Sequence, residues 1–298
     1  KEKWMTILIC FVFLLLASGA GAWKTNAKGG RIGSADDLKA AALCGVTGRM
    51  PDTSAEIFFR SLTGRKVGSY TGYGSIDECL TALKSGKADV LWTTDLTAGY
   101  LMTLDKDLLK LDTSDMAAIE NTVEPRFSFG MAAADTEKGK ELIDSVNYAI
   151  DYMKSDGILD ELKEKYIDGA AEAEPFYAKD MVVNDSLHKA YYHATKPLVI
   201  GVTGATPPLE LIDGDGRPYG FCVAFADELG QIMQRGVRFV VLDNETAFTS
   251  LMSGRVDLIF AYGAGRVTTE SGRNWIMSEG YLDMQKYEFL YIGADKED

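Results

Sequence analysis

Apolar residues recur along the chain in short continuous runs and in longer segments with helical spacing. Short segments, most of them largely apolar, have the length of strands and are predicted to form them; they are 42–46, 66–70, 88–93, 126–133, 198–202, 238–242, 256–261 and 287–292. The segments with apolar residues three or four positions apart are typical of helices packed on one face, and they are 54–62, 76–84, 140–154, 158–166, 223–233 and 247–252. Strands that alternate with helices predict α/β layers built on mostly parallel sheets.

The chain carries the same plan twice. The tetrapeptide G-V-T-G occurs at 45–48 and again at 201–204, and segment 83–91 is repeated in similar form at 251–259. Each copy follows the order strand, loop, helix, strand, helix, strand. Together with a length of 298 residues, this repeat predicts two lobes of similar architecture.

Two glycine-containing segments are interpreted as turns. Segments 85–87 and 253–255 carry a central glycine after a helix and are expected only to turn that helix into the next strand. The second copy also has an additional segment, 212–221, that contains the sequence D-G-D-G between apolar residues. We expect a β-hairpin there rather than a calcium loop, because a calcium loop needs a glutamate at a position occupied by Ala224.

The first 22 residues have the pattern of an export signal. Lys1 and Lys3 precede an apolar run at 4–17, and the small residues A-G-A at 20–22 form a cleavage pattern. The run is shorter than the ~20 residues of a comfortable membrane span, although an uncleaved anchor is the alternative. The sequence therefore predicts a secreted protein, periplasmic or on the extracellular side of the cytoplasmic membrane.

Charge and cysteine content narrow the function classes. The net charge of −13 argues against a nucleic-acid partner, which requires a basic surface. After the signal segment the cysteines are Cys44, Cys79 and Cys222, an odd number without a C-x-x-C motif. Cys44 and Cys222 lie among apolar residues and are expected to be small buried hydrophobic residues. A single disulfide bond remains an open alternative.

The sequence offers little for catalysis. Its two histidines, His188 and His193, both lie in the polar stretch 168–195, and they are five positions apart, which does not suit a metal site on one helix face. No nucleophile elbow, zinc-protease motif or phosphate loop is present in the sequence. We therefore expect a protein that is not an enzyme and that needs no cofactor or metal.

Segment 198–225 resembles the opening of the extracellular solute-binding proteins, family 3, of amino-acid importers. It contains T-P-P at 206–208, the D-G hairpin, and G-F followed by a helix. Segment 263–281 is similar to a later motif of that family, with T-T-E at 268–270 and S-E-G-Y at 278–281. The resemblance implies the type II periplasmic-binding-protein fold, an α/β protein of two lobes, each a mostly parallel sheet flanked by helices.

The first half of the chain resembles the other lobe of the same family. Segment 34–38, S-A-D-D-L, is similar to the start of that lobe, segment 52–56 to its ligand loop, and segment 157–166 to the terminal helices. The lobes therefore occur in swapped order, which indicates a circular permutation or, alternatively, a truncated tandem array. The predicted divisions are a signal peptide, the family's second lobe, a linker and the family's first lobe, at 1–22, 31–167, 168–195 and 196–298.

The resemblance implies that a small polar solute, an amino acid or similar, binds in a cleft between the lobes and is delivered to the permease of an ABC importer. The alternatives are the ligand-sensing extracellular domain of a membrane signalling protein, a truncated tandem binding module, and a degenerate lobe pair that binds a protein.

The candidate binding residues of the first half lie where strands end, because ligands of two-lobed α/β proteins bind at the carboxyl ends of strands. Thr53 and Ser54 open a helix and offer hydroxyls and backbone N–H groups to an anion, although plain helix capping is the alternative. Asp95 resembles the family's ammonium-binding aspartate but lies one residue late in register. Thr94, which occupies the aligned position, is the alternative, and Asp95 is then a solvated loop residue. Arg49 lies in the loop before Thr53 and reaches either the cleft or only the surface.

The second half departs most from the family pattern. Ser271 stands where the carboxylate-binding arginine is expected, so Arg266 or Arg273 is predicted to replace that arginine. Thr206 stands where the family often has an aromatic clamp. Trp92 and Tyr262 are considered as substitutes for that clamp but are expected to be core residues. Thr203 and Gly263, near the ends of two strands of this lobe, complete the predicted set.

Overall fold

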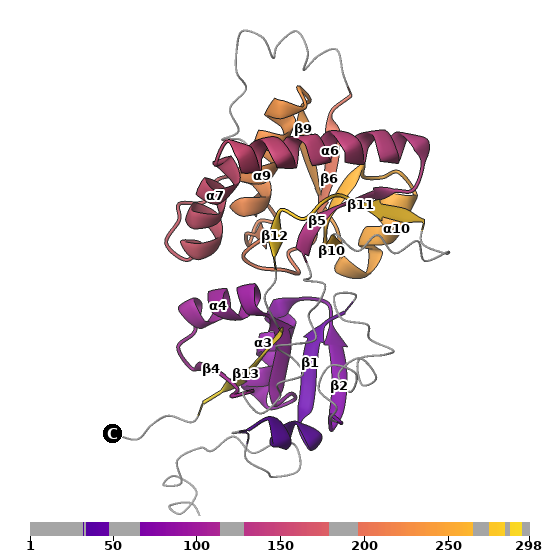
Figure 1. Cartoon of the computed structure of the whole chain (residues 1–298). Coiled ribbons are helices and arrows are strands. Elements are labelled where there is room, and N and C mark those ends of the chain that lie inside the picture. Colours follow the sequence, from indigo (N-terminus) through magenta and orange to yellow (C-terminus); the bar gives the residue numbers. More distant parts are fainter. Residues whose placement is uncertain are drawn as a thin grey trace, which may run out of the picture.

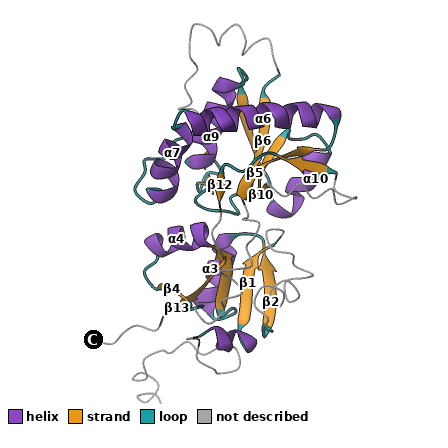
Figure 2. Cartoon of the chain, in the orientation of Figure 1, coloured by secondary structure: helices purple, strands orange, loops and turns teal. Residues whose placement is uncertain are grey.

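Two β-sheets, each covered by helices, form two lobes in the computed structural model (Figures 1 and 2). The structure describes residue 32 and the ranges 34–47, 66–113, 128–178, 196–264, 274–283 and 287–293. Within these ranges no helix is both long enough and apolar enough to cross a membrane.

The first sheet has five strands and only one reversed direction. Its spatial order is β2 (Ser69–Tyr73), β1 (Ala42–Val46), β3 (Val90–Thr94), β13 (Tyr287–Ile292) and β4 (Leu108–Lys110). Strands β2, β1 and β3 are parallel, whereas β13 runs antiparallel to both of its neighbours. The predicted bounds of β1 and β13 are confirmed, and the predicted strand at 66–70 lies three residues later in the structure.

The second sheet has the same arrangement. Its main path is β11 (Trp275–Met277), β5 (Ser128–Ala134), β10 (Leu258–Ala264), β6 (Leu198–Val202) and β9 (Val237–Val241). The short strand β12 (Leu282–Asp283) also pairs with β5. Strands β6, β9 and β10 are parallel and β5 is antiparallel to β10. The predicted hairpin is confirmed as β7 (Leu211–Ile212) and β8 (Pro218–Tyr219).

Each sheet contains one strand from the opposite half of the chain. The order β2-β1-β3-β13-β4 corresponds position by position to β9-β6-β10-β5-β11, with the antiparallel strand fourth in both. Strand β13, the last of the predicted strands, comes from the second half of the chain and pairs in the first sheet. The strand expected at 126–133 was placed in the first unit, and this is corrected: β5 pairs in the second sheet. The pattern of apolar residues identifies a buried strand but not the sheet that it joins.

Helices cover both sheets (Figure 2). The α-helices of the described residues are α3 (Ile76–Ser85), α4 (Asp95–Leu104), α6 (Glu137–Ser155), α7 (Ile158–Lys163), α9 (Phe221–Ile232) and α10 (Ala247–Met252). Shorter helical segments are the 3-10 helices η1 (Ala35–Lys39) and η5 (Asn244–Thr246) and the π-helix η3 (Glu164–Asp168). All of the α-helices except α4 correspond to predicted segments, whereas the predicted helix at 54–62 lies outside the described residues.

In both lobes a glycine with positive φ ends a helix and leads the chain into the next strand. Gly86 follows α3 with φ +75° and Gly254 follows α10 with φ +70°. This left-handed conformation ends a helix at little cost only for glycine. The expectation that these two turns lead a helix into the next strand is confirmed.

The aspartate of each repeat anchors the first strand of its lobe. Oδ2 of Asp89 accepts a hydrogen bond from the Ala42 backbone N–H at 2.8 Å. Oδ2 of Asp257 accepts the equivalent bond from Val199 at 3.0 Å. The sequence repeat at 83–91 and 251–259 therefore has a structural basis in each lobe.

Aromatic residues fix the exchanged strand of the first sheet. The ring of Phe289 on β13 stacks on Trp92 of β3 with centroids 6.0 Å apart, and Tyr287 meets the same indole edge-on at 5.5 Å. All three side chains are buried. The expectation that Trp92 is a core residue is confirmed. Its contacts with Phe289 and Tyr287 stabilise the pairing of β13, which comes from the second half of the chain, in the first sheet.

Candidate binding site between the lobes

The carboxyl ends of strands from the two lobes meet at the start of α4. Strand β3 ends at Thr94, whose hydroxyl donates to Thr97 Oγ1 at 3.2 Å. The Thr97 hydroxyl in turn donates to the carbonyl oxygen of Pro207 at 2.7 Å. Pro207 lies in the loop that follows β6 in the second lobe, so this buried chain of hydrogen bonds crosses from one lobe to the other.

A second pair of strand ends meets beside the first. Thr47 follows β1, and its carbonyl oxygen accepts a hydrogen bond from Nδ2 of Asn244, which follows β9. Four parallel strands, two from each lobe, therefore direct their carboxyl ends to one interlobe region. In open α/β sheets this is the location of ligand sites.

The β7–β8 hairpin adds a third contact. The side chain of Tyr219 on β8 is hydrogen-bonded to Tyr100 on α4 of the first lobe. Burial, with Tyr219 as a further contribution, raises the pKa of Tyr100 to about 12. Both phenols therefore remain protonated at neutral pH, as this hydrogen bond requires.

A buried carboxylate shapes the loop after β6. Glu210 is 1% exposed, and its Oε1 accepts the Thr203 backbone N–H at 2.9 Å. The Thr203 hydroxyl lies 3.2 Å from Oε2 and also accepts the Ala205 N–H. Thr203, a predicted ligand residue, thus already has hydrogen-bond partners in Glu210 and Ala205 that hold the loop in shape.

Thr206 lies at the point where this loop meets the first lobe. Its neighbour Ala205 packs into the apolar cluster formed by first-lobe residues such as Val46 and Ala98. The Thr206 side chain is 6% exposed, and among the described residues its Oγ1 has no hydrogen-bond partner. A buried hydroxyl without a partner is costly, so this oxygen is available to a polar ligand.

Asp95 and Thr94 both lie in the first turn of α4. Thr94 is the N-cap, and its Oγ1 accepts the Thr97 backbone N–H at 3.2 Å. Asp95 is half-buried, and its Oδ1 accepts the Leu96 N–H at 2.9 Å. Thr94 therefore acts as a helix cap, and Asp95 lies two positions before Thr97, whose hydroxyl bonds to the second lobe.

The remaining predicted residues are placed as follows. Gly263 is the additional residue of a β-bulge, because the register between β10 and β5 shifts between Tyr262 and Ala264. Bulges of this kind often redirect a strand beside a binding site. The other six lie outside the described residues, and they are Arg49, Thr53, Ser54, Arg266, Ser271 and Arg273. The structure thus brings Thr94 and Asp95 close to the loop of Thr203 and Thr206.

Sequence reasoning did not identify Thr97, Tyr100 or Glu210 as interlobe residues. Glu210 had a signal, since it follows the T-P-P stretch on which the family resemblance partly rests. The sequence gives no such signal for Thr97 and Tyr100, because α4 lacks a clear stripe of apolar residues along one face. Its residues contact the first lobe on one face and the second lobe on another, and this double contact obscures helical periodicity.

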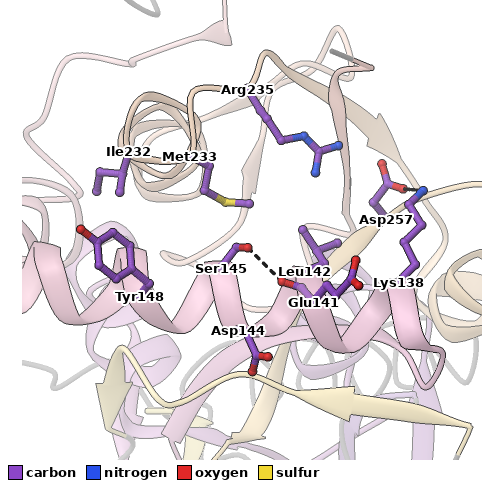
Figure 3. A pocket seen from close by; sticks show the side chains of 10 residues that line it. All are labelled: Lys138, Glu141, Leu142, Asp144, Ser145, Tyr148, Ile232, Met233, Arg235 and Asp257. Atoms are coloured by element: carbon purple, nitrogen blue, oxygen red, sulfur yellow. Dashed lines mark hydrogen bonds and ion pairs between the residues drawn. The ribbon is translucent and has the colours of Figure 1, made fainter. Parts of the chain in front are cut away.

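A separate pocket of 620 Å³ lies on the second lobe between α6 and the end of α9 (Figure 3). Its wall combines cations and carboxylates, including Lys138 and Asp257 at 4.0 Å from each other, with the apolar side chains of Ile232 and Met233. None of the predicted site residues lines it. The described part of the chain contains no group of three or more side chains that could hold a metal ion.

The strand order and the meeting of strand ends define a two-lobed α/β fold with the type II periplasmic-binding-protein architecture, as predicted. Residues 198–286 match the family of bacterial extracellular solute-binding proteins, family 3. The resemblance is thereby confirmed over just under a third of the chain. That family consists of binding proteins, which agrees with the expectation that the chain is not an enzyme.

Solved structures with similar folds have low sequence identity. A mutant of ArgBP from T. maritima is 14% identical, with 88% of this chain and 86% of that chain covered and a TM-score of 0.42. An ancestral arginine-binding protein bound to glutamine is 13% identical, with 87% and 86% covered and a TM-score of 0.42.

The second substrate-binding domain of Lactococcus lactis GlnP, in an open conformation, is 10% identical, with 87% and 83% covered and a TM-score of 0.35. No curated protein matches the sequence.

Proposed function

We propose that the protein binds a small polar solute, an amino acid or a similar molecule, between its two lobes. The observation that carries this proposal is the convergence of four strand ends at the interlobe region, where Thr97 Oγ1 of one lobe donates to Pro207 of the other at 2.7 Å. A cleft bounded by strand ends of both lobes closes when the lobes approach each other.

The chemistry of the region favours a ligand with a cationic group. Asp95 offers a carboxylate at the start of α4. The Thr206 hydroxyl, which has no hydrogen-bond partner within the described part of the chain, offers a neutral hydrogen-bonding group in the other lobe. For the anionic end of an amino acid we propose Arg266, with Arg49, Thr53, Ser54, Ser271 and Arg273 as the other candidates. A guanidinium fork binds a carboxylate through two parallel hydrogen bonds.

The decisive experiment is a thermal-shift screen of the full chain against each standard amino acid, short peptides and small organic anions. A ligand present at 100 times its dissociation constant stabilises the folded protein by about 2.7 kcal/mol. For a protein of this size we therefore expect a rise in Tm of roughly 5–10 °C with one chemical class. A well-folded chain with no shift for any compound contradicts the proposal.

Matched variants localise the binding. Asp95→Ala and Arg266→Ala are expected to abolish the shift. Asp77→Ala and Arg255→Ala remove the same charges from exposed positions and are expected to keep it. If the control variants lose the thermal shift as well, the loss is caused by the change in net charge, and Asp95 and Arg266 do not form the binding site.

We further propose that the protein is exported and acts outside the cytoplasmic membrane, where it delivers the solute to the permease of an ABC importer. The supporting observations are the signal-like pattern at 1–22 and the extracellular family matched at 198–286. Co-purification of a membrane permease with the solute-loaded chain is the expected result. Co-purification of a kinase or cyclase instead indicates the sensor alternative.

The swapped lobe order is proposed to be a circular permutation. Of the divisions 1–22, 31–167, 168–195 and 196–298 expected along the chain, the second also supplies β5, α6 and α7, which pack in the second lobe. A variant opened within the linker, with residue 298 joined to residue 31 by a flexible segment, restores the order of the family. We expect this variant to bind the same solute as the parent chain. A variant that folds but no longer binds contradicts the permutation.

A further inference from the structure

Two of the buried cysteines lie against each other in the first lobe. Cys44 belongs to β1 and Cys79 to α3, which packs on that strand. Both residues are 0% exposed and belong to the same apolar cluster. Sγ of Cys44 lies 4.0 Å from the carbonyl oxygen of Cys79, so the two residues are in direct contact.

We propose that Cys44 and Cys79 form a disulfide bond when the chain folds under oxidising conditions. The bond joins a strand to the helix that covers it, two elements already in contact. Disulfides persist in extracytoplasmic compartments, and the predicted export would bring the chain to one. The chemistry itself does not depend on the proposed solute or on the compartment.

The third cysteine after the signal segment lies elsewhere. Cys222 is at the start of α9 in the second lobe and is also 0% exposed. Its Sγ–H donates to the carbonyl oxygen of Tyr219 at 3.4 Å. The three cysteines after the signal segment therefore consist of one pair in contact and one separate thiol. Cys222 can serve as the control in tests of disulfide formation between the other two.

The reaction is thiol–disulfide exchange with a small disulfide such as oxidised glutathione. The thiolate of one cysteine attacks a glutathione sulfur and releases one glutathione thiol. The second cysteine then attacks the mixed disulfide and releases the other. In total, two protein S–H groups lose two protons and two electrons, one S–S bond forms, and one glutathione disulfide becomes two thiols.

Burial determines when this reaction takes place. The hydrogen bond to Cys79 and burial both raise the pKa of the Cys44 thiol well above its ordinary value. Because the thiolate is the attacking species, the thiols of the folded, reduced protein react slowly. The bond therefore forms during folding, and once buried it is protected from reductants.

The bond has a consequence for the proposed ligand loop. Cys44 and Cys79 are 35 positions apart, and the segment between them contains Arg49, Thr53 and Ser54. A crosslink across this segment restricts the unfolded chain by loop-closure entropy. It also fixes both ends of the segment that carries these candidate ligand residues.

Peptide mapping of the full chain tests the proposal directly. The protein is unfolded, reduced, and refolded with oxidised and reduced glutathione, after which free thiols are blocked and the chain is digested with trypsin. We expect peptides 40–49 and 67–84 to be linked, with a mass two hydrogens below their sum. Recovery of both peptides as blocked free thiols overturns the proposal.

Stability measurements with matched variants give a second readout. The parent chain refolded with excess reductant is expected to have a Tm roughly 10 °C below that of the same chain refolded with oxidised glutathione. Cys222→Ala is expected to retain this difference and Cys44→Ala to lose it. Equal dependence on reductant in Cys44→Ala and the parent overturns the proposal. Solute binding is measured separately, so failure here leaves the proposed function untouched.

Discussion

At the scale of single residues, Glu210 shows how one buried carboxylate organises the interlobe loop. It accepts the Thr203 backbone N–H, lies within hydrogen-bonding distance of the Thr203 hydroxyl, and is almost completely buried. A buried donor that loses its acceptor retains its desolvation cost without compensation. The conformation of the loop that carries Thr206 and Pro207 therefore depends on this side chain.

We expect Glu210→Ala to lower the free energy of unfolding by about 3 kcal/mol, because it leaves the partly buried Thr203 N–H without this acceptor and opens a cavity where the buried Glu210 side chain lay. Urea denaturation of the two proteins measures this difference. The control is Glu245→Ala, at an exposed position, which is expected to change stability by no more than about 0.5 kcal/mol. Equal stability of Glu210→Ala and the parent contradicts the structural role.

Asp213 gives the hairpin an acid-sensitive contact. Hydrogen bonds from Arg217, first from its backbone N–H and then from its side chain, lower the pKa of Asp213 to about 2. Since the folded-state pKa lies below the unfolded value of about 3.9, the stabilisation is complete above that value. It is lost as the pH falls from about 4 towards 2.

Carboxyl NMR titration is expected to give a midpoint near 2 for Asp213. Arg217→Ala keeps the backbone N–H, which is the largest cause, and is expected to preserve most of the shift. Asp213→Asn removes the titrating group and with it this part of the acid dependence of stability. A midpoint near 4 for Asp213 in the parent chain contradicts the contact.

At the scale of elements, the helix-to-strand turns are the most predictable part of the fold. Gly86 and Gly254 occupy equivalent positions in the two sequence repeats, and both have positive φ. Nothing lies within 4 Å of a Cβ built at either position. The requirement for glycine there is therefore conformational rather than steric.

Gly86→Ala and Gly254→Ala are each expected to lower the free energy of unfolding by about 1 kcal/mol, because a side chain is strained in the left-handed region. The two effects are expected to add in the double variant, since the turns lie in different lobes. Gly214→Ala is the control, because Gly214 has open surroundings and no positive φ. A double variant as stable as Gly214→Ala refutes this account.

Sequence periodicity predicted β1, β6, β13 and α10 with their observed bounds, because each buries one continuous apolar face. It assigned β5 to the wrong sheet, because an apolar strand can be buried in either of the two sheets and its sequence does not distinguish them. It missed α4, whose apolar residues face two partners. Of the candidate site, the loop of Thr203 and Thr206 and the start of α4 were predicted, whereas the Thr97–Pro207 contact depends on long-range packing.

At the scale of the whole molecule, the relation between the lobes depends on a few specific contacts. The Thr97–Pro207 hydrogen bond, the Asn244–Thr47 bond and the Tyr100–Tyr219 pair join them beside the strand ends. A net contribution of about 1 kcal/mol for each hydrogen bond is large enough to shift an equilibrium between closed and open lobes.

Thr97→Val keeps the shape of a fully buried side chain and removes the donor to Pro207. We expect the ratio of closed to open molecules to fall by roughly 5- to 30-fold, the range that corresponds to 1–2 kcal/mol. A larger radius of gyration in X-ray scattering and a similar loss of solute affinity follow from this shift.

Thr103→Val, on the same helix, is the control for this variant, because the Thr103 hydroxyl donates to the backbone carbonyl oxygen of Tyr100 within α4. It is expected to leave both measurements unchanged. An identical scattering profile and affinity for Thr97→Val and the parent chain show that the contact does not govern closure.

The exchanged strands, β5 and β13, determine whether the two halves of the molecule stay associated after the backbone is cleaved. Strand β5 precedes the linker but pairs in the second sheet, and β13 follows the linker but pairs in the first. A protease that cuts between 179 and 195 produces two fragments that remain held together as one particle, since each fragment supplies a central strand to the other. Two genes that encode these fragments separately yield an obligate heterodimer, in which neither fragment completes a sheet without the other.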